Sequence, residues 1–173
     1  ADETLWHNEA LYSKTPGRFR DLLARYEQAD WSEQALYETE MRNLRFYGYG
    51  IKSFGLSMIE TAIKLTGGRI QARDIQAIID LVKEMLRAPV QLLDHVEEVL
   101  PALAADHTLM LITKGDLLDQ EAKIARSDLG PYFAHVEIVP DKNPEVYRSI
   151  LDKHGIRPER FLMVGNSVRS DIL

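Results

Sequence analysis

The strongest constraint on the fold is a regular alternation of short apolar runs and helical segments in the second half of the chain. Three apolar runs occur there, TLMLI at 108–112, HVEIV at 135–139 and FLMV at 161–164. A helical pattern precedes the first run, and two more, over 116–128 and 144–154, separate the runs. Buried strands alternating with helices are typical of a doubly wound sheet. We therefore predict an α/β fold with a Rossmann-like parallel sheet.

The first half of the chain has a different rhythm. From residue 17 to about residue 104 apolar residues recur at helical spacing, and no segment alternates like a strand. The apolar stripes of the four expected helices are Phe19, Leu22, Leu23 and Tyr26; Leu36, Met41 and Leu44; Leu56, Ile59 and Ile63; and Ile75, Ile78, Ile79, Val82, Met85 and Leu86. Asp30 and Glu33 are spaced like a capping box for the second helix. This half predicts a compact helical bundle.

Composition excludes several classes of protein. The chain has 173 residues, 45% of them hydrophobic, and a net charge of −6, which disfavours nucleic acid as a partner. It contains no cysteine, so disulfides, thiolate catalysis and cysteine zinc sites are excluded. No apolar run approaches the roughly 18 residues of a membrane span, and no signal segment is apparent. We expect a soluble cytoplasmic protein without a membrane partner, either a monomer or a homodimer.

Polar residues follow each apolar run, where the carboxyl ends of parallel strands meet at one edge of a sheet. They are Thr113, Lys114, Gly115 and Asp116; Asp141 and Lys142; and Gly165, Asn166 and Asp171. In open parallel sheets the ligand lies beyond this edge. A hydroxyl and backbone N–H groups can hold phosphate oxygens, a lysine can balance charge, and oxygen ligands suit Mg²⁺. The pattern therefore indicates a phosphate-handling site.

Each of these side chains also has a purely structural explanation. Thr113 could be a β-former closing its strand, and Asp116 and Asn166 could cap helices. Lys142 could be solvated at a helix start, although a cation there opposes the helix dipole. These explanations do not account for all three strand ends being polar in a complementary way.

The pattern resembles the haloacid dehalogenase-like hydrolase superfamily. Residues 1–4, Ala-Asp-Glu-Thr, look like the end of its first motif, Asp-x-Asp-x-Thr. Thr113 in LMLIT matches the second motif, Lys142 in PDKNPEVY the third, and GNSVRSD, with Asn166 and Asp171, loosely matches the fourth. The resemblance implies a core formed by residues 1–12 and 91–173, with a helical cap inserted at 13–90.

By this resemblance the family's nucleophilic Asp, and the strand that carries it, would lie immediately before Ala1. The chain is also expected to stop inside the helix after the fourth motif. A second departure from the family pattern is Asn166, which stands where many members carry Asp and removes one negative charge from the metal site. We therefore expect the 173-residue chain to hydrolyse neither p-nitrophenyl phosphate nor acetyl phosphate.

The resemblance implies a Mg²⁺-dependent phosphatase that acts through an aspartyl-phosphate. Asp2 would be the general acid and base, Thr113 would bind a phosphoryl oxygen with help from Lys114 and Gly115, and Lys142 would balance charge. The missing upstream aspartate, the Asp2 carbonyl, and Asn166 or Asp171, directly or through water, would hold Mg²⁺. The substrate would be a small phosphorylated metabolite or a phosphoprotein.

Substrate selection and two alternative functions stay open. His7, Tyr47, Tyr49 and Lys52 are candidate substrate contacts, the last three from the segment RFYGYGIKSF, which we expect to link two helices of the cap. One alternative is a metal-free dehalogenase, although such relatives generally carry Tyr where this chain has Asp2. The other is a non-catalytic interaction domain, in which the helical half binds a partner.

Overall fold

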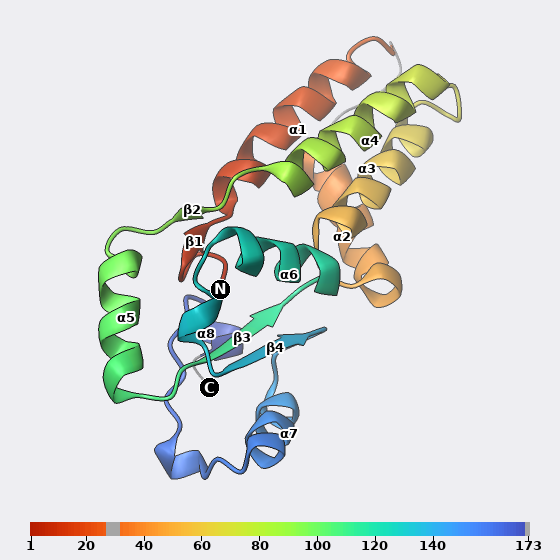
Figure 1. Ribbon diagram of the computed structural model, residues 1–173. Coiled ribbons are helices and arrows are strands. Elements are labelled where there is room, and N and C mark those ends of the chain that lie inside the picture. The colour runs from red at the N-terminus through yellow and green to blue at the C-terminus, as the bar shows by residue number, and fades with distance from the viewer. Residues whose placement is uncertain (27–31, 172–173) are drawn as a thin grey trace. The chain divides into compact units, whose positions relative to one another are not determined.

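The computed structural model describes residues 1–26 and 32–171, and the chain divides into two compact units (Figure 1). One unit combines Ala1–Asn8 with the chain from Pro89 onward, and the other is Glu9–Ala88. The first contains a parallel β-ladder flanked by helices, and the second is entirely helical within its described residues. The predicted α/β class with an inserted helical unit is confirmed.

The α/β unit is built on two parallel strands. β3 (Met110–Lys114) pairs with β4 (His135–Val139) in a register that places Thr113 opposite Ile138. The remaining elements of this unit are β1 (Trp6–His7), paired antiparallel with β2 (Gln91–Leu92), α5 (Val96–Asp106), α6 (Leu117–Arg126), α7 (Pro144–His154), α8 (Val168–Asp171) and 3₁₀ turns at Gly130–Tyr132 and Pro158–Arg160. β4 and α7 have the predicted bounds, whereas β3 lies two residues later than TLMLI.

The two faces of this ladder pack against different helices (Figure 1). Leu111 on β3 shares a buried cluster with Ile124 of α6, whereas its neighbour Ile112 clusters with Ile150 of α7. Successive side chains of a strand point to opposite faces, so α6 and α7 cover opposite sides. The order β3–α6–β4–α7 therefore makes a doubly wound arrangement.

The predicted third buried strand, FLMV at 161–164, is not present. These residues have no regular secondary structure, and none of the described residues pairs with them in a β-ladder. Leu162 and Val164 are 84% and 71% exposed, whereas Phe161 and Met163 are half-buried. A strand is defined by its ladder, and apolar content alone does not supply a partner.

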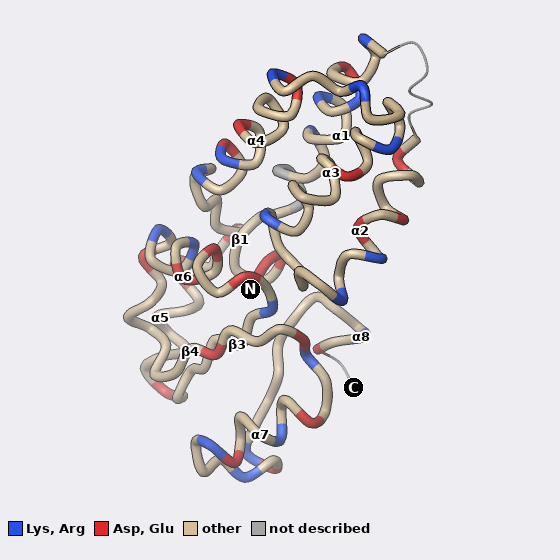
Figure 2. The backbone as a smooth tube through the Cα atoms, turned by 90° about the vertical axis from the view of Figure 1, so that its right-hand side faces the viewer, with Lys and Arg blue, Asp and Glu red and all other residues tan. Residues whose placement is uncertain are grey.

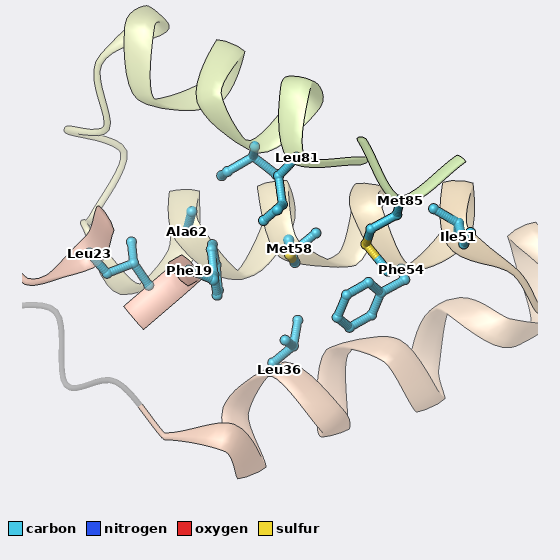
Figure 3. Packing of buried hydrophobic residues seen from close by; sticks show 10 residues of the cluster. Phe19, Leu23, Leu36, Ile51, Phe54, Met58, Ala62, Leu81 and Met85 are labelled. Carbon is cyan, nitrogen blue, oxygen red and sulfur yellow. The ribbon is translucent and has the colours of Figure 1, made fainter. Parts of the chain in front are cut away.

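The helical unit consists of α1 (Glu9–Leu23), α2 (Glu33–Tyr47), α3 (Ile51–Leu65) and α4 (Ala72–Arg87). Ten buried side chains form one core, nine of which are labelled in Figure 3: Phe19, Leu23, Leu36, Ile51, Phe54, Met58, Ala62, Leu81 and Met85. All four helices contribute to this core. The predicted helical bundle is therefore confirmed for the described residues.

Some details of the helical unit differ from the prediction. α1 starts well before residue 17 and continues through Pro16, so the expected unit boundary at 12/13 cuts a helix. Asp30, half of the proposed capping box, lies outside the described residues. The cap of α2 is instead Ser32, whose hydroxyl accepts from the Ala35 N–H at 3.1 Å. The helix start was therefore predicted nearly correctly, but from the wrong capping residue.

A buried carboxylate joins the ends of two helices in this unit. Asp74, in the first turn of α4, is 2% exposed and accepts hydrogen bonds from Tyr26 Oη at 2.5 Å and Arg25 Nη1 at 2.8 Å. Both donors follow the end of α1. Elsewhere acidic and basic residues are interspersed along the helices (Figure 2), and exposed pairs such as Arg18–Glu84 add little stability.

We predict that Met58→Ala lowers the free energy of unfolding by about 2–5 kcal/mol, because truncating a fully buried side chain leaves a cavity. Met41→Ala is the matched control. Met41 is 39% exposed, so its loss should change stability by about 0.5 kcal/mol or less. Urea denaturation of the two variants measures the difference. Equal effects would contradict the assignment of this core.

A second prediction concerns Glu137 on β4, whose carboxylate accepts from Lys153 and contacts His154 Nε2, each at 2.7 Å. Hydrogen bonds from Lys153 and His154 hold the pKa of Glu137 below its usual range. A lowered pKa stabilises the fold above the unfolded value of about 4.3, and this stabilisation is lost as pH falls through the folded pKa. The loss of stability in Glu137→Gln should therefore be fully present above the unfolded pKa and shrink as the pH falls below it.

Urea midpoints at several pH values measure this difference. Glu145→Gln is the control, because its pair with Arg148 is exposed. A Glu137→Gln effect independent of pH would show that packing, and not charge, holds α7 against β4.

Candidate active site

The best-defined feature near the expected site is a buried ion pair. Lys142 Nζ lies 2.7 Å from Asp171 Oδ1, and the two side chains are only 8% and 2% exposed. Lys142 follows β4, and Asp171 ends α8. The structure thus brings together two site residues predicted from separate motifs. The reading of Lys142 as a solvated side chain is wrong.

Asp171 is held by several further donors. Oδ1 accepts from Tyr147 Oη at 3.3 Å, and Oδ2 accepts from the Ser167 N–H at 3.1 Å. Gly165 passes so close to this carboxylate that a Cβ there would collide with it. The close approach of Asp171 therefore requires a glycine at 165. Asp171 in turn holds Lys142 in position.

Charge and burial act in opposite directions on this cluster. Burial raises the pKa of Asp171, but the hydrogen bonds from Lys142 and Ser167 outweigh it, so the pKa lies below its usual range. Burial, followed by the charge of Asp171, raises the pKa of Tyr147 to about 12. Asp171 is thus ionised and Tyr147 is a neutral donor at neutral pH.

Thr113 is the last residue but one of β3 and is 1% exposed. Its hydroxyl donates to Gln120 Oε1 of α6 at 2.9 Å. Gly115 has φ +149°, and a Cβ there would lie 3.1 Å from Gln120 Nε2. Gly115 therefore leaves room for the glutamine that orients Thr113.

Asp2 is held near the start of the chain by a second group of contacts. Its Oδ1 accepts from Trp6 Nε1 at 2.7 Å and lies 3.5 Å from Lys123 Nζ. Trp6 is 1% exposed and packs in the core beside Leu111 and Ile124. The polar opening segment is therefore anchored by one large buried indole.

The nitrogen of Ala1 lies in the same electrostatic environment as Lys142. Burial, followed by the positive charge of Lys142, lowers the pKa of the Ala1 amino group to about 6. Asp2 and Asp171 act in the opposite direction. The charges of Lys142 and Asp171 therefore both act on the Ala1 nitrogen.

The other predicted site residues lie in varied settings. Lys114 is 3.5 Å from Asp141, and Asp116 is the cap of α6, as its structural explanation proposed. His7 is exposed on β1. Tyr47, Tyr49 and Lys52 are exposed in the helical unit, but the segment RFYGYGIKSF is mostly the ends of α2 and α3, and its linker is only Gly48–Gly50.

The magnesium ligands expected from the sequence, among them the Asp2 carbonyl and Asn166 or Asp171, stay a prediction. Asn166 is exposed, and Ser167, not Asn166, caps α8 through a 3.2 Å bond to the Ser170 N–H. Both oxygens of Asp171 are taken by protein donors. In residues 1–26 and 32–171 no group of three or more acidic or histidine side chains could hold a metal ion. A magnesium site would need a further carboxylate.

Sequence reasoning missed two buried polar residues of α6. Gln120 and Lys123 are 2% and 5% exposed, whereas Leu117 and Leu118 at the start of the helix are 59% and 66% exposed. Polar residues inside and leucines outside invert the usual pattern of a surface helix. This inverted pattern was the signal that could have identified the two residues, because departures from ordinary helix patterning are expected at functional sites.

We predict that Asp171→Asn lowers the free energy of unfolding by about 3–5 kcal/mol, because it leaves the Lys142 ammonium buried without its counter-ion. Asp152→Asn is the control, since Asp152 is exposed on α7 and should change stability by about 0.5 kcal/mol or less. Urea denaturation also shows whether adding Lys142→Met partly restores stability. A double variant with additive losses would rule out the ion pair.

Comparison with known proteins gives a strong structural match. The crystal structure of a haloacid dehalogenase-like family hydrolase from Xanthomonas campestris is 44% identical, with a TM-score of 0.92, over 99% of this chain and 72% of that one. The HAD-hydrolase YfnB of Bacillus subtilis, in a magnesium-bound form, gives 15% identity and a TM-score of 0.63 over 99% of this chain and 79% of that one. An L-2-haloacid dehalogenase from Xanthobacter autotrophicus gives 17% identity and a TM-score of 0.54 over 91% of this chain and 64% of that one. The last two show the fold alone.

Among curated proteins, glyceraldehyde 3-phosphate phosphatase of Pyrococcus furiosus is 34% identical over 67 residues. The match covers 36% of this chain and spans only 28% of the length of that phosphatase. No helix within residues 1–26 and 32–171 has the length and apolar character needed to cross a membrane. The sequence profile of the haloacid dehalogenase-like hydrolases matches residues 1–173. The chain therefore belongs to the haloacid dehalogenase-like hydrolase family.

Proposed function

We propose that the protein is a phosphomonoester hydrolase that acts through an aspartyl-phosphate intermediate. The observation that carries the proposal is the buried Lys142 ammonium, which Asp171 holds at 2.7 Å and whose charge acts on the Ala1 nitrogen. In a chain that extends before Ala1, the preceding residue would enter the field of this cation. An aspartate there would have its negative charge balanced by Lys142, as phosphoryl transfer requires.

The partial match to a phosphatase supports this choice of reaction. So does Asp2, because a carboxyl at this position can transfer a proton, whereas dehalogenase relatives generally carry tyrosine there. The distant dehalogenase structure supports the fold without supporting haloacid turnover. We therefore place a phosphorylated metabolite or phosphoprotein ahead of a haloacid as substrate.

In the proposed first step, the upstream aspartate attacks phosphorus and the bond to the leaving oxygen breaks. A protonated Asp2 gives its proton to that oxygen, so the leaving group departs as a neutral alcohol. Thr113 is buried near the end of β3, and its hydroxyl would turn from Gln120 Oε1 to donate to a phosphoryl oxygen, while Lys142 would balance the added charge. Asp2 would then take a proton from water as the water oxygen attacks phosphorus; the bond between the aspartyl oxygen and phosphorus breaks, which releases inorganic phosphate and regenerates the upstream carboxylate.

Magnesium would reduce the charge repulsion between the incoming carboxylate and the phosphate. The upstream aspartate, the Asp2 carbonyl and Asn166 would hold it, with Asp171 contributing through water. The upstream aspartate would supply the carboxylate that the described residues lack.

The function is tested with the chain extended upstream of Ala1 by its own natural sequence. This protein should hydrolyse p-nitrophenyl phosphate in the presence of Mg²⁺ and be inhibited by beryllium fluoride. Replacing the upstream Asp by Asn should abolish turnover, and Asp2→Asn should slow it by about 100-fold or more, because a general acid is lost. Lys153→Met, on the exposed side of α7, is the control.

Two results would contradict the proposal. One is turnover of 2-chloropropionate but no phosphomonoester by the extended protein, which would favour a dehalogenase. The other is hydrolysis by the 173-residue chain that depends on Thr113 and Lys142, which would place the nucleophile elsewhere. A screen of phosphorylated metabolites then identifies the substrate.

A further inference from the structure

The inner face of α6 contacts both candidate residues that would handle the phosphate and the proton. Gln120 Oε1 accepts from the Thr113 hydroxyl at 2.9 Å, and Lys123 Nζ lies 3.5 Å from Asp2 Oδ1. Positions three apart on a helix lie on one face, so a single element positions both side chains. Both Gln120 and Lys123 are buried.

Lys123 is coordinated in a way that suits a positioning role. Its ammonium has three N–H donors and three acceptors: Asn8 Oδ1 at 3.1 Å, Asp2 Oδ1 at 3.5 Å and Asp119 Oδ2 at 3.5 Å. Its side chain is 6% exposed. A lysine that has two hydrogen bonds, an ion pair and little solvent contact is restricted in its motion, so it holds the groups around it in place.

The contacts also distinguish the two oxygens of Asp2. Trp6 Nε1 and Lys123 Nζ both approach Oδ1. Among the described residues no donor contacts Oδ2, and the Asp2 side chain is 31% exposed. One oxygen of the carboxyl is therefore held by the protein, and the other is free to face a substrate.

We infer that Lys123 is a positioning residue, which together with Trp6 locks Asp2 through Oδ1 so that Oδ2 exchanges protons with the leaving group and water. This inference rests on the proposed function for its catalytic consequence, but its geometry does not. Lys123 touches no reacting atom. Its effect is on the orientation of Asp2, and hence on the rate of the chemical step more than on substrate binding.

The kinetic test uses the naturally extended protein. Lys123→Met should lower kcat by about 10- to 100-fold while KM changes less than about threefold, because misorientation of an acid affects the transition state more than binding. Lys123→Arg, which keeps the charge and the donors, should recover a large part of the lost kcat. Lys153→Met is the control for loss of a lysine in the same unit, and it should retain wild-type values.

A second readout is independent of catalysis. The chain has two tryptophans, so a Trp31→Phe background leaves Trp6 as the single indole N–H signal in a ¹H–¹⁵N spectrum. Asp2→Asn calibrates the change when the carboxylate acceptor is lost. Lys123→Met should move the Trp6 signal in the 173-residue chain, and Lys153→Met should not.

These two readouts separate the failure of the inference from the failure of the function. If the extended protein hydrolyses no phosphomonoester but Lys123→Met moves the Trp6 signal, the proposed function fails and the positioning of Asp2 stands. The inference is overturned if Lys123→Met leaves kcat and the Trp6 signal unchanged. It is also overturned if Lys123→Arg is as slow as Lys123→Met. Should Lys123→Met not fold, Lys123→Gln takes its place in both measurements.

Discussion

The buried pair of Lys142 and Asp171 is the interaction on which the arrangement of the site depends. Neither side chain has enough solvent contact to be charged alone, so each requires the other. The carboxylate in turn draws in the Ser167 N–H and the Tyr147 hydroxyl, and its approach requires a glycine at 165. One ion pair thereby ties α7 and α8 to the loop between them and sets the charge near Ala1.

A second organising element is α6, which carries its polar residues inward. A helix that buries Asp119, Gln120 and Lys123 while exposing leucines forgoes hydrophobic stabilisation. Its buried side chains instead contact Thr113 and Asp2, which lie on different segments of the chain, and hold both in place. Burial disfavours the charge on Asp119 and raises its pKa, although Lys123 partly opposes this. The polar inner face of α6 is therefore explained by the candidate site residues that it contacts.

Much of the fold could be predicted from the sequence, and the reasons are local. Periodicity located β4, α7 and the four helices of the inserted unit, because this signal acts within a few residues. The motif residues Thr113, Lys142 and Asp171 could be picked out because each follows an apolar run. FLMV was misread, since a strand needs a partner, and the sequence of the run itself does not reveal one. The predicted helical pattern began at residue 17, whereas α1 begins at Glu9 and continues through Pro16.

The sequence by itself determined the α/β class, the insertion of a helical unit and the family, because these follow from chain order and residue types. Only the tertiary structure decided which polar groups meet. In the folded chain Lys142 pairs with Asp171, Thr113 donates to Gln120, and Lys123 contacts Asp2. These partners are separated by up to 121 residues in the sequence. Such contacts depend on how helices pack on the sheet, and burial then makes each unpaired polar group costly enough to select its partner.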